Sequence, residues 1–143
     1  MKLSTGKVAF PIEFDNGDKQ TIYFNPNDPD LMIRMKNFEG KVQEKIKGFD
    51  DVELSEEGKP THISQIEAFE KMQNIVKEEL DYAFGGSVSD FVFKHCSPFA
   101  IVGGQYFVLQ FIEAITPEIE KHIKKANADV EKRMAKHLDK YKK

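Results

Sequence analysis

The chain has 143 residues, a formal net charge of −3, 40% hydrophobic and 31% charged residues, and one cysteine, Cys96. A chain of this length forms one domain by default and buries most of its apolar surface without disulfides or metal ions. One cysteine excludes an internal disulfide, and no apolar run approaches the roughly 20 residues of a membrane span. We therefore expect a single cytosolic domain over 1–143, without a standard export signal or a membrane segment.

The charge is unevenly spread along the chain. From Pro117 onward there are nine Lys or Arg and five Asp or Glu, so this segment is basic while the rest is acidic. A basic segment can meet nucleic acid or an acidic partner. Here the basic residues alternate with Asp129, Glu131 and Asp139 and have few aromatic neighbours. This pattern favours a solvated helix face over a nucleic-acid site.

The N-terminal region has the alternation of a strand with one buried face. Its apolar positions are Val8, Phe10, Ile12 and Phe14. The turn sequence Asn16-Gly17 follows, and 21–24 supplies a return strand. We predict a β-hairpin over 7–24. Because two strands alone are marginal in water, its Phe-rich face must lie on the helices that follow.

The next segment carries a complete set of helix-start signals. Asp28 is a favourable N-cap, Pro29 fits the first helical position, and Asp30 favours the positive end of the helix dipole. We predict a helix from Pro29 to Lys47, ended by Gly48. Its buried stripe has helical spacing and comprises Leu31, Met35, Phe38, Val42 and Ile46.

A helical core is predicted over 29–116, interrupted by one exposed loop. Residues 49–60 are acidic and rich in helix breakers, which is typical of an exposed connection. A second amphipathic helix is predicted from about His62 or Ser64 to Phe84, where Gly85-Gly86 ends it. Its predicted buried face comprises Ile66, Phe69, Met72 or Gln73, Val76, Leu80 and Ala83.

The segment from Ser87 onward leads to a central helix. Ser87 or Ser89 can cap a short helix through Lys94. The helix that begins near Gln105 is apolar on most of its circumference, so we expect it to be buried. At Pro117 the chain either kinks a continuous helix or starts a new one, and we favour a new helix after a sharp bend.

The predicted C-terminal helix over 117–143 is amphipathic and basic. Its thin apolar stripe comprises Ile119, Ile123, Ala126, Val130, Met134 and Leu138. The stripe is too narrow for burial on both sides. Two interpretations of this stripe are equally good. Either the helix packs on its own domain, or it binds a partner protein through Ile119, Ile123, Val130, Met134 and Leu138. The predicted fold class is α+β, mainly α: an N-terminal hairpin packed on a bundle of about four helices.

We find no pattern that indicates chemistry. His95 and Cys96 are adjacent in sequence, whereas a Cys–His enzyme normally brings the two from distant segments. The other histidines, His62, His122 and His137, have no metal-ligand spacing. The glycine pairs at 85–86 and 103–104 lack the features of a phosphate-binding loop. We therefore expect no catalytic residue, no metal, no cofactor and no small-molecule substrate.

Several segments together resemble a group of small proteins encoded by tailed phages and prophages of Gram-positive bacteria. These segments are 24–29 (Phe-Asn-Pro-Asn-Asp-Pro), 82–85 (Tyr-Ala-Phe-Gly), 90–93 (Asp-Phe-Val-Phe), 97–99 (Ser-Pro-Phe), 103–107 (Gly-Gly-Gln-Tyr-Phe), 111–113 (Phe-Ile-Glu) and 117–119 (Pro-Glu-Ile). The group is similar to the tail assembly chaperones of long-tailed phages. The resemblance covers most of the chain from about Lys7 to Ile123, and its marks are apolar positions and glycines rather than an active-site signature.

The resemblance implies a non-enzymatic function in the cytoplasm of the phage host. A protein of this kind holds the tape-measure protein and helps to recruit tail-tube subunits, and self-association is an additional expectation. Two alternatives stay open. One is an adaptor protein unrelated to tails, and the other, which we favour least, is a nucleic-acid-binding protein that uses the basic C-terminal helix.

Overall fold

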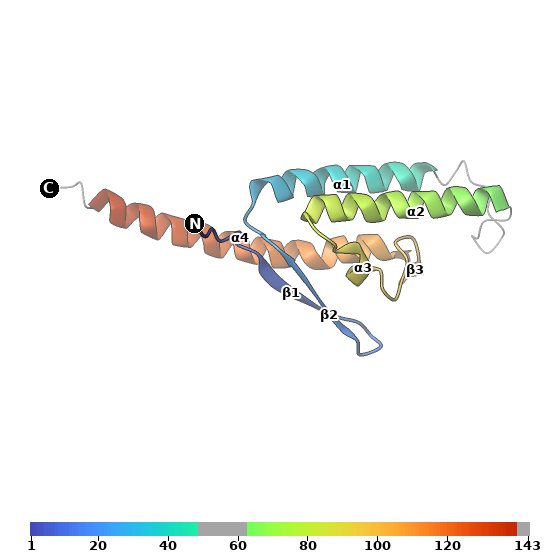
Figure 1. Cartoon of the computed structure of the whole chain (residues 1–143), viewed down its shortest axis with the longest axis horizontal. Helices are drawn as coiled ribbons and strands as arrows, with labels where there is room; N and C mark the ends of the chain where they lie inside the picture. Colours follow the sequence, from blue (N-terminus) through green and yellow to red (C-terminus); the bar gives the residue numbers. More distant parts are fainter. Residues whose placement is uncertain (49–62, 140–143) are drawn as a thin grey trace.

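The computed structural model describes residues 1–48 and 63–139, and it confirms the predicted fold class. An N-terminal antiparallel hairpin is followed by helices α1, α2, α3 and α4, with a second, very short hairpin before α4. Helices α1 and α2 lie side by side, and α4 runs beneath them with the hairpin against it (Figure 1). The predicted acidic loop over 49–60 lies outside the described residues.

The first hairpin joins β1 (Val8–Glu13) and β2 (Lys19–Phe24), with Phe10 opposite Ile22 and Val8 opposite Phe24. Phe10, Ile22 and Phe24 are buried, which confirms that the apolar face lies on the helices. In the turn only Gly17 has a positive φ, of 87°. Asn16 instead accepts a hydrogen bond from the Asp18 backbone N–H at 3.0 Å.

A series of ring contacts connects the hairpin to the helices. Phe24 stacks on Phe10 with ring centroids 4.2 Å apart and meets Phe84 of α2 edge-on at 4.7 Å. Phe84 in turn contacts Phe111 of α4, at 5.9 Å. Because large aromatic rings bury much area and pair favourably in these geometries, the hairpin is a full part of the core.

Helix α1 (Pro29–Lys47) begins and ends as predicted. The Asp28 side chain accepts a hydrogen bond from the Asp30 N–H at 3.0 Å, Pro29 occupies the first turn, and Gly48 forms the C-cap. The predicted stripe faces the core, since Leu31, Met35, Phe38 and Val42 are buried and Ile46 packs against them. The capping residues and the apolar periodicity of α1 favour the same helix that the tertiary contacts stabilise.

Helix α2 (Ile63–Phe84) pairs with α1, and Lys41 of α1 forms an ion pair with Glu79 at 2.8 Å. Val76, Leu80 and Ala83 are buried as predicted, but Ile66 is half-exposed, so its assignment to the core was wrong. The apolar periodicity of α2 extends to the start of the helix, but the core does not cover the side chain of Ile66 there.

The short helix α3 (Ser89–Val92) ends earlier than the predicted Lys94 and is not capped by a serine. The carboxylate of Asp81 in α2 accepts hydrogen bonds from the backbone N–H of Val88, at 2.8 Å, and of Ser89, at 2.7 Å. It also accepts the Ser89 hydroxyl at 2.8 Å. A residue of the preceding helix therefore does the work of an N-cap.

Between α3 and α4 the structure contains a hairpin that the sequence pattern did not predict. Strands β3 (Ile101–Val102) and β4 (Gln105–Tyr106) pair across Gly103-Gly104. Both glycines have positive φ, 59° and 81°, which a two-residue hairpin turn of this type requires. The central helix consequently begins at Phe107, two residues later than expected.

Helix α4 (Phe107–Asp139) is continuous, so the predicted bend and new helix at 117 were wrong. Pro117 lies inside the helix on its exposed side, while Ile115 and Ile119 on either side of it are buried in the same core. The Thr116 hydroxyl donates to the carbonyl of Ile112 at 2.7 Å in this turn. Burial of apolar residues before and after the proline offsets the lost backbone hydrogen bond.

Pro117→Ala is expected to stabilise the protein. The substitution restores a backbone donor in the helix interior and removes the ring's clash with the preceding turn, for a gain of about 1–3 kcal/mol in the free energy of unfolding. Chemical denaturation monitored by circular dichroism measures it. The control is the opposite change, Ala114→Pro, on the same exposed side of α4, which should lower the free energy of unfolding. A Pro117→Ala variant no more stable than the wild type would contradict the expectation.

Candidate protein-binding surface

The C-terminal part of α4 extends away from the rest of the molecule. Figure 1 shows the helix running past the ends of α1 and α2. The last fully buried residue along it is Ile119, at 2% exposure. From Lys124 to Asp139 the helix measures about 24 Å at 1.5 Å per residue. A helix this short is marginal alone in water, so its continuity with the packed half of α4 stabilises it.

The structure divides the five residues predicted to bind a partner into two sets. Ile119 belongs to the core, and Ile123 is half-buried and packs against the core. These two residues therefore pack on their own domain, which was the alternative interpretation. Val130, Met134 and Leu138 are 54%, 60% and 58% exposed. We call these three residues the α4 stripe; they are the part of the predicted surface that is open to a partner.

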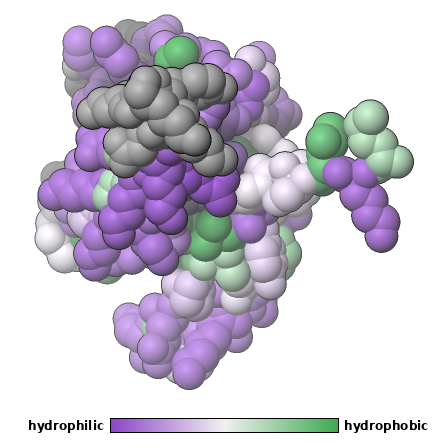
Figure 2. Space-filling model, turned by 90° about the vertical axis from the view of Figure 1, so that its left-hand side faces the viewer, coloured by the Kyte–Doolittle hydropathy of each residue, from purple (hydrophilic) through white to green (hydrophobic). Residues whose placement is uncertain are grey.

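The α4 stripe lies on a basic helix. From Lys124 to Leu138 there are five Lys or Arg and two Asp or Glu. The face of the molecule from which α4 projects is mostly hydrophilic in Figure 2. An apolar stripe on a basic helix fits a partner helix that offers an apolar face with acidic neighbours.

A groove between α1 and α4 is the feature that sequence reasoning missed. Two adjoining hollows of about 460 and 190 Å³ share Lys36 and Glu39 of α1. Met32 and Leu109 contribute apolar surface, and Gly40 lines the middle without a side chain. We call this the α1–α4 groove. Its available signals were Met32, an apolar residue off the buried stripe, and a glycine inside a helix.

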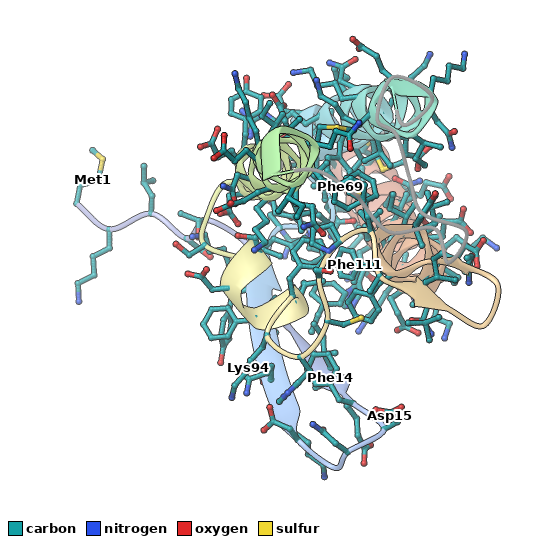
Figure 3. All side chains as sticks on the ribbon, turned by 90° about the vertical axis from the view of Figure 1, so that its right-hand side faces the viewer. Met1, Phe14, Asp15, Phe69, Lys94 and Phe111 are labelled. Atoms are coloured by element: carbon teal, nitrogen blue, oxygen red, sulfur yellow. The ribbon has the colours of Figure 1, made fainter. Side chains whose placement is uncertain are left out.

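The tip of the first hairpin is held against the segment after α3. Asp18 accepts from His95 Nε2 at 2.7 Å and forms an ion pair with Lys94 at 3.3 Å. The Asn16 amide lies 3.3 Å from His95 Nδ1. The His95 ring also contacts Phe14 edge-on. Figure 3 shows Phe14 and Asp15 at this end of the hairpin, with Lys94 at the same end of the molecule. Both ring nitrogens of His95 therefore have partners in a structural contact.

Cys96 does not have the environment of an activated nucleophile. Burial, and then the charge of Asp15, raise the pKa of its thiol. A catalytic cysteine needs the opposite, because the thiolate is the nucleophile. His95 is turned to the hairpin tip, so adjacency in sequence does not produce a Cys–His pair here.

The described residues hold no group of three or more His, Cys, Asp or Glu that could bind a metal ion. His122 packs its ring on Phe10 at 5.1 Å, and His62 lies outside the described residues. Among the helices of residues 1–48 and 63–139, none is long and apolar enough to span a bilayer.

Comparison with known proteins adds no assignment. No family model matches the chain, and no curated protein and no solved structure is significantly similar to it.

The contact between Asp18 and the segment after α3 predicts a specific acid sensitivity. The hydrogen bonds from His95 and then Gln20 hold the pKa of Asp18 well below its usual range. Because the unfolded chain binds this proton at higher pH than the folded one, the stabilisation is present at neutral pH and is lost as the pH falls below about 4. Asp18→Asn should flatten this part of the stability profile, measured by urea unfolding between pH 7 and pH 2.

Asp90→Asn, which removes an exposed carboxylate with no such contact, is the control for that profile. Equal slopes for wild type and Asp18→Asn would show that the hairpin-tip contact contributes nothing in solution.

Proposed function

We propose that this chain is a non-enzymatic protein of the host cytosol that binds other phage tail proteins during assembly, in the manner of a tail assembly chaperone. The observation that carries the binding function is the exposed α4 stripe on a basic helix that extends from the body. The choice of tail proteins as partners rests on the sequence resemblance described above.

The physical form of the α4 end favours a long helical partner. Three apolar side chains at successive turns match the anchor spacing of helix-in-groove recognition. The net positive charge around them favours a segment with acidic neighbours and speeds its encounter with the protein. A tape-measure protein, as a long partner with many helical segments, offers repeated sites of this kind.

The test mixes the purified protein with candidate tape-measure segments and measures the mass by size-exclusion chromatography with light scattering. A larger complex is expected for the wild type. Val130→Asp with Met134→Asp should abolish it, because two charges then occupy the apolar contact, while the melting temperature stays nearly unchanged. Ala128→Asp with Ala135→Asp is the matched control, since it adds equal charge on the opposite face of the same exposed segment.

Two outcomes would overturn the proposal. A wild-type protein that ignores every tape-measure segment points to an adaptor unrelated to tails. Binding of a DNA or RNA probe at low salt that weakens steeply as salt is added points to the basic helix as a nucleic-acid site.

A further inference from the structure

The α1–α4 groove is as long as about three turns of a helix. It runs from Met32 to Gln43 on α1 and from Leu109 to Glu120 on α4, a length of about 17 Å at 1.5 Å per residue. The two helices run antiparallel along it, because Met32 lies near Ile119 and Gly40 near Leu109. The open middle at Gly40, where an added Cβ would meet nothing within 4 Å, allows a third helix to approach closely.

The wall of this groove and the α4 stripe lie on one face of the same helix. On the groove side the face contains Ile112, Thr116 and Ile119. On the projecting side it contains Val130, Met134 and Leu138. The steps between these residues are three, four or seven, with Ile123 between the two sets, so they follow one side of a helix. The hairpin contacts α4 at His122, about 100° round the helix from Ile123. On the face itself, Ile112 and Ile119 are buried at the base of the groove, whereas Val130, Met134 and Leu138 are exposed.

The α1–α4 groove and the projecting end of α4 have opposite charge. The groove is lined by Glu39, Glu113 and Glu120 with one lysine, Lys36. The projecting segment from Lys124 to Leu138 has five basic and two acidic residues. The groove of one copy is therefore complementary in charge to the projecting end of another copy, whereas two grooves or two projecting ends repel each other.

We propose that, without another partner, two copies of the chain pair antiparallel through this face of α4, so that the projecting end of each copy lies in the α1–α4 groove of the other. The stripe spans about 12 Å and fits within the groove length. The contact is isologous: the same surface acts on both copies, and both ends are satisfied at once, which closes the assembly as a dimer.

The opposite orientation is disfavoured by the same charges. A parallel pair would place the two basic ends together and the two acidic grooves together. An antiparallel pair places each basic end against an acidic groove and covers all three residues of the α4 stripe.

The experiment uses two charge variants of the full chain. The groove variant is Glu39→Lys with Glu120→Lys, and the end variant is Lys124→Glu with Arg133→Glu. All four side chains are exposed, so folding should be unaffected, and circular dichroism checks it. Sedimentation equilibrium is measured for the wild type, for each variant, and for an equal mixture of the two variants.

The wild type is expected at twice the chain mass of 16.4 kDa. Each variant alone should be shifted toward monomer, with a dissociation constant at least about tenfold larger, because groove and end then carry the same sign. The mixture should form a heterodimer, because each groove again meets an end of opposite sign. A monomeric wild type, variants that stay dimeric, or a mixture that stays monomeric would each overturn the proposal.

This pairing uses the α4 stripe that the proposed function assigns to tail proteins, so a tail protein and a second copy compete. The groove variant separates the two ideas, because its stripe is intact. It should bind tape-measure segments at least as tightly as the wild type, since no second copy has to leave first. If the chain does not self-associate, its binding to tape-measure segments can still be measured. If it does not bind those segments, its dimerisation can still be measured.

Discussion

Phe24→Ala is expected to lower the free energy of unfolding by about 3–5 kcal/mol, the range for removing a large aromatic side chain from a packed core. Phe24 is 2% exposed, stacks on Phe10 and contacts Phe84 of α2. Its removal leaves a cavity between hairpin and helices and breaks the series of ring contacts that joins them. Because domains of this size are stable by only about 5–15 kcal/mol, the loss should be plain in urea denaturation.

Tyr23→Ala is the control within the same strand. Tyr23 is 59% exposed and points to the other face of the hairpin, so only strand propensity and a little surface are lost, less than about 1 kcal/mol. Phe24→Leu, which keeps most of the volume, should fall between the two. If Phe24→Ala and Tyr23→Ala cost the same, the hairpin is not packed on the helices as described.

Asp81→Ala should be the most damaging change of a polar residue among those described, at about 2–4 kcal/mol. It removes a cap, worth up to about 2 kcal/mol, and leaves the Val88 and Ser89 donors without their acceptor. The Ser89 hydroxyl is affected most, because Ser89 is buried and also donates to this carboxylate. Thermal and urea unfolding measure the loss.

Asp81→Asn retains one carbonyl oxygen and is expected to lose about half as much, because one acceptor survives. Glu78→Ala removes an exposed carboxylate one turn earlier in α2 and should change stability by less than about 0.5 kcal/mol. A loss from Asp81→Ala no larger than that of Glu78→Ala would mean that α3 does not depend on this contact.

Elements with local signals could be predicted from the sequence alone. The start and end of α1 follow from Asp28, Pro29 and Gly48, whose effects act within a few residues. The first hairpin follows from alternation and Asn16-Gly17. The burial of Phe10 and Phe24 was also predictable, because an isolated hairpin needs a surface to cover its apolar face.

The candidate site was predictable in part. Periodicity identified the apolar residues along the end of α4, but it could not distinguish the burial of Ile119 from that of Val130. One is buried and the other exposed, since burial depends on where the body of the protein ends beside the helix. The α1–α4 groove depends on the relative placement of two helices far apart in sequence.

By itself, therefore, the sequence determined the strand and helix periods, the caps of α1, the position of the first turn and the uneven charge, because each depends on neighbours along the chain. Only the tertiary structure decided that Pro117 lies within one continuous helix, that Asp81 caps α3, and that a groove faces the same side of α4 as the exposed stripe. The continuous helix at Pro117 and the groove depend on packing free energy between distant segments, which outweighs a local preference of about 1–3 kcal/mol. The Asp81 cap depends on hydrogen bonds to groups seven and eight residues away, which is beyond the range of a local capping pattern.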